Sequence, residues 1–84
     1  MTVPSDKKGM TYPRDILNEI KWGGGGLSQV VITYLHRGAP GDLASIRGEE
    51  IVELGRSFFS THESKIPYHR IRIIENDGEE VFHL

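Results

Sequence analysis

The 84-residue sequence contains no cysteine and no run of apolar residues that approaches the roughly 20 needed to cross a membrane. Without cysteine, the chain has neither a disulfide framework nor a zinc site built from thiolates. Residues 1–10 include two lysines but no apolar stretch, so they lack the pattern of a secretory signal. We therefore expect a soluble cytoplasmic protein that has no membrane partner.

A strong excess of either charge is also missing. The sequence has 10 Lys and Arg residues against 12 Asp and Glu residues, a formal net charge of −2, which is not typical of a strongly basic nucleic-acid-binding protein. Four of the acidic residues fall within residues 75–80, whereas residues 56–72 contain four basic side chains and one acidic side chain. This uneven distribution predicts one moderately basic face.

The first part of the chain predicts an arm, a helix and a glycine loop. Residues 1–10 show no apolar periodicity and predict a disordered arm, so the single domain should cover residues 11–84. A helix should follow Thr11 or Tyr12 as its cap, because proline at the next position suits a first helical turn. Its apolar stripe consists of Ile16, Leu17 and Ile20.

Four consecutive glycines, residues 23–26, should end this helix. We interpret them as a flexible loop, since glycine has high conformational entropy and no side chain to pack. A phosphate cradle is the alternative, but the run lacks a following lysine–serine pair and comes after a helix instead of a strand. Trp22, directly before the glycines, is expected at the edge of the core.

The rest of the chain alternates β-branched or aromatic segments with turns. Strands are predicted within residues 28–37, 51–54, 71–75 and 81–84, and around Phe58 and Phe59, of which only one can face the core. Turns are predicted at residues 36–42, 61–64 and 76–78. The expected fold class is therefore α+β: one N-terminal helix on a mainly antiparallel sheet of about five strands, in two layers.

Two hexapeptides, residues 46–51 and 66–71, share a spacing in which an isoleucine stands on each side of four turn residues. Pro67 in the second copy keeps its neighbour Ile66 extended. An apolar strand follows each copy. We interpret the pair as two similar units in one sheet, each of which turns into a strand.

Two histidine–arginine pairs, His36-Arg37 and His69-Arg70, each lie beside a turn at a strand end. If the turns meet, they would offer two guanidinium forks that match phosphate oxygens and two imidazoles that donate to phosphate. Tyr34 or Tyr68 would then stack on a base. The structural alternative is that His69 caps a turn while the two arginines pair with carboxylates, namely Asp42 and Glu50.

Other catalytic patterns are weak. No serine lies in a nucleophile elbow, so Asp42 and the histidines do not predict a hydrolase triad. His62, Glu63 and His69 are candidate metal ligands, but their spacing matches no metal-binding motif, and we expect neither a metal nor a cofactor. His62 and His83 are expected to be solvated surface residues.

Four blocks of the sequence resemble a known family. They are R-D-I-L-N-E-I-K-W (14–22), H-R-G-A-P-G-D (36–42), G-E-E-I-V-E-L-G-R-S-F-F (48–59) and I-P-Y-H-R-I (66–71). Together they resemble the RNA cyclic-group end recognition domain, a small domain of archaea, bacteria and eukaryotes. The glycine run at residues 23–26 departs from this resemblance, because relatives have a more polar loop there.

The resemblance implies a binding partner and a set of binding residues. The partner would be the 3′ end of an RNA that carries a phosphate or a 2′,3′-cyclic phosphate, and RNA-processing enzymes would act beside the domain. The implied binding residues are His36, Arg37, Tyr68, His69 and Arg70, with Arg14 and Arg56 as weaker members.

Three functions remain open on the sequence. The first is a non-catalytic RNA-binding module in which Arg37 and Arg70 clamp a terminal phosphate. The second is a small phosphoesterase that uses His36 and His69 as general base and acid. The third is a protein-interaction module that uses an exposed sheet edge.

Overall fold

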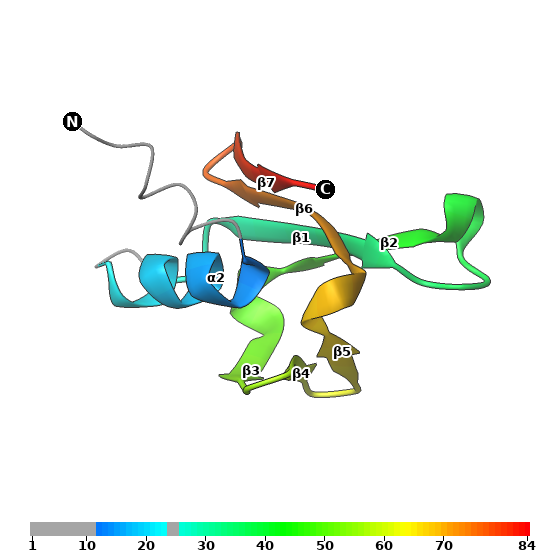
Figure 1. Cartoon of the computed structure of the whole chain (residues 1–84), viewed down its shortest axis with the longest axis horizontal. Coiled ribbons are helices and arrows are strands. Elements are labelled where there is room, and N and C mark those ends of the chain that lie inside the picture. Colours follow the sequence, from blue (N-terminus) through cyan, green and yellow to red (C-terminus); the bar gives the residue numbers. More distant parts are fainter. Residues whose placement is uncertain (1–11, 24–25) are drawn as a thin grey trace.

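The computed structural model describes residues 12–23 and 26–84 of the chain (Figure 1). The arm predicted over residues 1–10 and the middle of the predicted glycine loop lie outside the described residues. No helix in the described part of the chain has the length and apolarity that a membrane crossing requires.

The predicted helix is confirmed as α2 (Pro13–Trp22). Tyr12 is extended and its carbonyl accepts the first helical hydrogen bond, from the Ile16 amide at 3.1 Å. Ile16 and Leu17 are buried, as the apolar stripe predicts. The placement of Trp22 at the core edge is wrong, since its side chain is 78% exposed. Five residues after Leu17, it lies roughly 140° around the helix from that buried position.

The α+β class is confirmed, but the strands form two antiparallel sheets instead of one sheet of about five strands. The first sheet has the order β2-β1-β6-β7 and the second has the order β3-β4-β5. The strands are β1 (Val30–Leu35), β2 (Leu43–Arg47), β3 (Ile51–Leu54), β4 (Phe58–Thr61), β5 (Lys65–Pro67), β6 (Ile71–Asn76) and β7 (Glu79–His83).

The sequence failed to predict β2 and β5, and both lie at a sheet edge. Every residue of β2 is exposed or half-buried, so its sequence carries little hydrophobic signal. β5 has only three residues and contains a proline, which is tolerated at an edge.

The two hexapeptides with the shared spacing form the crossings between the sheets. Each contains a 3-10 turn that follows an extended residue: η2 (Gly48–Glu50) leads from β2 to β3, and η3 (Tyr68–Arg70) leads from β5 to β6. The prediction of two turns into strands is therefore confirmed, but their placement in one sheet is wrong. In both cases the turn carries the chain from one sheet to the other.

One hydrophobic core lies among α2, η3 and the two sheets (Figure 1). Its buried side chains come from α2, η3 and strands β1, β4, β5 and β6, and comprise Ile16, Leu17, Val30, Ile32, Phe59, Ile66, Tyr68, Ile71 and Ile74. Phe59 is fully buried whereas Phe58 is 39% exposed, which confirms that only one of the pair faces the core.

The two hairpin turns are also confirmed. Asp77 and Gly78 between β6 and β7 have φ values of 55° and 82°, the positive values that a tight two-residue hairpin turn requires. Between β4 and β5, the Thr61 hydroxyl accepts hydrogen bonds from the amides of Glu63 and Ser64, at 3.2 and 3.1 Å.

Candidate functional site

The loop of residues 36–42 joins β1 to β2 and is the tight turn that the sequence predicts. The His36 amide donates to the Asp42 carbonyl at 2.8 Å, and the Asp42 amide donates to the Ala39 carbonyl at 2.7 Å. Gly38, with φ 95°, and Gly41, with φ 67°, adopt backbone conformations that other residues rarely reach. These contacts account for the loop's shape, but they leave the His36 and Arg37 side chains exposed.

Tyr68 in the second turn is a core residue. Its side chain is 1% exposed, its ring lies 5.7 Å from that of Phe59, and its hydroxyl donates to the Gly55 carbonyl at 2.8 Å. The Tyr68 amide donates to the Ser57 carbonyl at 3.2 Å. A buried ring has no free face on which a base can stack, so the predicted stacking role of Tyr68 is corrected to a structural one.

Burial also changes the acidity of this residue. Desolvation raises the pKa of Tyr68 above its usual value of 10.0. Arg14 opposes this rise because a nearby cation favours the phenolate, whereas Tyr12 and Glu53 add to it. Arg14, half-buried in the first turn of α2, thus acts on the Tyr68 hydroxyl.

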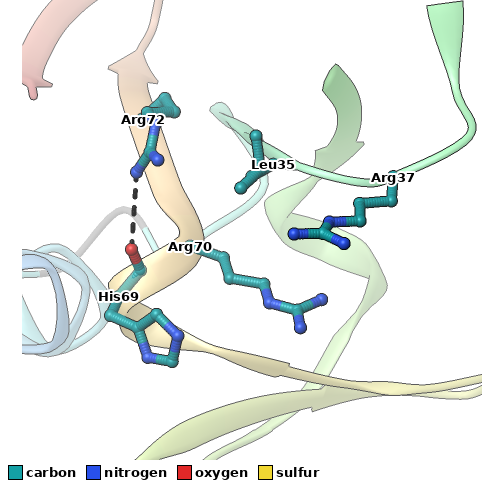
Figure 2. Close-up of a pocket in the computed structure, with 5 residues that line it drawn as sticks. All are labelled: Leu35, Arg37, His69, Arg70 and Arg72. Carbon is teal, nitrogen blue, oxygen red and sulfur yellow. Dashed lines mark hydrogen bonds between the residues drawn. The ribbon is translucent and has the colours of Figure 1, made fainter. Parts of the chain in front are cut away.

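The two histidine–arginine turns meet at one cavity of about 340 Å³, which we call the arginine cavity. Its lining consists of Leu35, Arg37, His69, Arg70 and Arg72. In Figure 2 the guanidinium groups of Arg37 and Arg70 extend toward each other from opposite sides. The turns meet because β1 and β6 are antiparallel neighbours in which Tyr34 lies opposite Ile71, so the end of one strand adjoins the start of the other.

Arg72 is a member of the cavity that the sequence reasoning missed. It is the extra residue of a β-bulge, since Ile73 pairs with Thr33 and Ile71 pairs with Tyr34 while Arg72 has no partner across the ladder. Its Nη1 donates to the His69 carbonyl at 3.4 Å, drawn as the dashed line in Figure 2. The sequence carries only a faint signal for this bulge, because the isoleucines at positions 71, 73 and 74 do not keep strict alternation; the structure buries Ile71 and Ile74, three positions apart.

The arginines of the cavity have no acidic partners among residues 12–23 and 26–84. Asp42 accepts a hydrogen bond from the Gly38 amide at 3.4 Å, and Glu50 accepts one from the Arg47 amide at 3.1 Å. The alternative in which these carboxylates neutralise Arg37 and Arg70 is therefore wrong. Like charges around one cavity repel one another, so an anion in the cavity would relieve that repulsion.

The other predicted binding residues do not line the arginine cavity. His36 lies beside Tyr34, with the ring centroids 6.0 Å apart. His36 thus lies on the side of Tyr34, whereas Arg37 lines the cavity together with Leu35. Arg56 is exposed on the loop between β3 and β4. Its neighbours Gly55 and Ser57 accept hydrogen bonds from the hydroxyl and the amide of Tyr68.

The remaining histidines lie elsewhere on the surface. His62 and Glu63 line a separate hollow with Glu50 and Thr61. His83 is exposed and its Nδ1 lies 2.8 Å from the Glu80 carboxylate. Within the described residues, no three His, Asp or Glu side chains come together as metal ligands. The surface positions predicted for His62 and His83 are confirmed.

Residues 10–83 match the family described as the MJ1316 RNA cyclic group end recognition domain. The chain is also similar to UPF0248 proteins of archaea. It is 44% identical over 48 residues to one from Thermococcus onnurineus, in a match that spans 56% of this chain and 54% of that protein. It is 38% identical over 64 residues to one from Methanococcus vannielii, in a match that spans 75% of this chain and 77% of that protein. The chain thus covers about half the length of the Thermococcus relative, and no solved structure matches it.

Proposed function

The chain belongs to the MJ1316 RNA cyclic group end recognition domain family, as its four sequence blocks predict, and from this premise we propose that it binds the phosphate-bearing end of an RNA strand. The observation that supports the proposal best is the arginine cavity. Arg37, Arg70 and Arg72 surround it, and none of them has a carboxylate partner among the described residues.

A phosphate suits this lining chemically. Each guanidinium is planar and always charged, and it presents parallel N–H groups that bind two phosphate oxygens at once. A 2′,3′-cyclic phosphate has two non-bridging oxygens. One guanidinium group can bind both of them while a second guanidinium group binds from the other side. His69 is exposed at the cavity and supplies a further donor.

The cavity favours binding over phosphodiester chemistry. Opening a cyclic phosphate requires a base that activates the nucleophile and an acid that protonates the leaving oxygen. Among the described residues, His69 is the single histidine that lines the cavity, and the other polar lining side chains are arginines, which donate hydrogen bonds but have no acceptor atom. The phosphoesterase alternative would need His36 at the same cavity, and His36 lies beside Tyr34 instead.

The finer parts of the proposal concern the ligand and its context. We take the 3′ end as the bound end and the cyclic phosphate as the preferred group, because the family description names a cyclic group at an RNA end. Enzymes that produce or consume such ends would be the partners of the domain.

Equilibrium binding to one short RNA tests the proposal. The RNA is prepared with a 3′-hydroxyl, a 3′-phosphate or a 2′,3′-cyclic phosphate, and each form is measured at two salt concentrations. We expect the cyclic end to bind most tightly to the wild type and to lose that preference in an Arg37→Ala/Arg70→Ala variant. Arg47→Ala is the control, because Arg47 is exposed, pairs with Glu49 at 3.5 Å and does not line the cavity. Weak binding that is equal for all three ends, and that falls with salt alike in wild type and variant, would refute end recognition.

A further inference from the structure

We infer that an apolar groove next to the arginine cavity receives the nucleobase of the terminal nucleotide. This inference rests on the proposed function and adds a base subsite to the phosphate site. The groove has a volume of about 270 Å³ and is lined by Tyr12, Pro13, Tyr68, His69, Ile71, Phe82 and Leu84.

The groove is formed by the start of α2, by the η3 turn with the first residue of β6, and by the end of β7 with Leu84. Contacts join α2 to both η3 and β7, and the Leu84 amide donates to the Arg72 carbonyl at 2.8 Å. In Figure 1 the start of α2 faces the η3 turn. The groove is therefore built on packed elements, with the buried side chains of Tyr68 and Ile71 beneath it.

His69 lines both the arginine cavity and the apolar groove. The η3 turn thus separates a cationic hollow from an apolar one, and a single exposed side chain borders both. A terminal nucleotide has the same arrangement, since its anionic phosphate and its aromatic base are joined through one ribose. The cationic cavity matches the phosphate and the apolar groove matches the base, so a nucleotide is the occupant that we infer.

Tyr12 gives the groove an accessible aromatic ring. Its side chain is 51% exposed, in contrast to the buried ring of Tyr68. Exposed aromatic side chains bind unpaired bases by stacking, which tolerates any base because every base has a π face. Tyr12 therefore takes the stacking role that the sequence assigned to Tyr34 or Tyr68. The Tyr12 side chain makes no capping hydrogen bond to α2, so its removal should leave the helix intact.

The test compares two RNAs that carry the same 3′-phosphate: one ends in a normal nucleotide and the other in an abasic nucleotide. We expect Tyr12→Ala to weaken binding of the normal RNA about tenfold, or about 1.4 kcal/mol, and to change binding of the abasic RNA little. Tyr12→Phe should keep the wild-type affinity, because it keeps the ring. Trp22→Ala is the matched control, since Trp22 is exposed at the other end of the same helix.

The outcomes separate the base subsite from the phosphate site. If the two RNAs bind the wild type equally and both lose affinity in the Arg37→Ala/Arg70→Ala variant, the phosphate site stands and the base subsite is refuted. If the arginine variant binds both RNAs as well as the wild type does, the proposed function itself fails. An equal loss from Tyr12→Ala for both RNAs would also overturn the inference, because it would show that Tyr12 acts without the base.

Discussion

Tyr68 and Gly55 tie the η3 turn to the loop between β3 and β4: the tyrosine hydroxyl donates to the carbonyl of the glycine directly after β3, over 2.8 Å. Because the same residue begins the turn that carries His69 and Arg70, this hydrogen bond anchors the residues that line the arginine cavity.

Tyr68→Phe should therefore destabilise the fold. The Gly55 carbonyl loses its donor while the ring stays in the core, and the loss of one such hydrogen bond costs roughly 0.5–1.5 kcal/mol. Urea unfolding at pH 8 measures this change. Tyr34→Phe is the control, since the Tyr34 ring is half-buried and its hydroxyl makes no comparable hydrogen bond within the described residues.

The wild type should also lose stability as the pH rises above 10. The pKa of Tyr68 is higher in the folded chain than its usual value of 10.0, so the unfolded chain releases the proton first. In that range the folded state binds more protons than the unfolded state, and the free energy of unfolding falls as pH rises. Unfolding at pH 9 and pH 11 should show a smaller fall in Tyr68→Phe than in the wild type. Equal falls in the two proteins would contradict this assignment.

The two histidines should differ in their effect on binding. His69 lines the arginine cavity and His36 does not, so His69→Ala should weaken binding of phosphate-ended RNA by roughly tenfold, the scale of one hydrogen bond to a charged group. His36→Ala should have little effect.

Incubation with a 2′,3′-cyclic nucleotide should show no turnover by the wild type. Turnover that either histidine variant abolished would instead support the phosphoesterase.

The slope of log affinity against log salt should report how many arginines contact phosphate. Alanine at Arg37, Arg70 or Arg72 should each reduce the slope of log affinity against log salt by about 0.7, the value for one contact to a single strand. Arg70→Lys should keep the slope but lower the affinity, because lysine keeps the charge and loses the planar fork. A slope that Arg47→Ala lowers as much as Arg70→Ala does would show that the attraction is not local to the cavity.

Gly48 should tolerate no side chain. It is buried at the start of η2, and a Cβ atom built there would overlap the Leu27 carbonyl oxygen and lie 2.9 Å from the Val30 Cβ. Since Val30 is a core residue, Gly48→Ala should cost roughly 1–3 kcal/mol or more of stability through overpacking. Thermal unfolding measures this cost. In Gly78→Ala, where the added methyl meets open space, the cost should come only from the φ of 82°.

The sequence by itself determined the local features of this protein, because short-range chemistry encodes them. The helix follows from a proline at its start and an apolar stripe that ends at glycine. The turn between β6 and β7 follows from residues that accept positive φ, and the turn between β4 and β5 follows from polar residues whose side chains bind the backbone. The family follows from four blocks of residues. The sequence placed both histidine–arginine pairs at strand ends for the same reason. Turn residues follow His36-Arg37, and His69-Arg70 comes directly before the strand that starts at Ile71.

Only the tertiary structure decided which of these parts meet. The pairing of Tyr34 with Ile71 brings Arg37 beside Arg70, and no local pattern specifies that β1 pairs with β6 instead of another strand. The bulge at Arg72 and the burial of Tyr68 likewise depend on which face the shared core covers. Strand pairing and side-chain direction in a turn are set by long-range packing, so the arginine cavity exists in the folded chain and is only partly visible in its sequence.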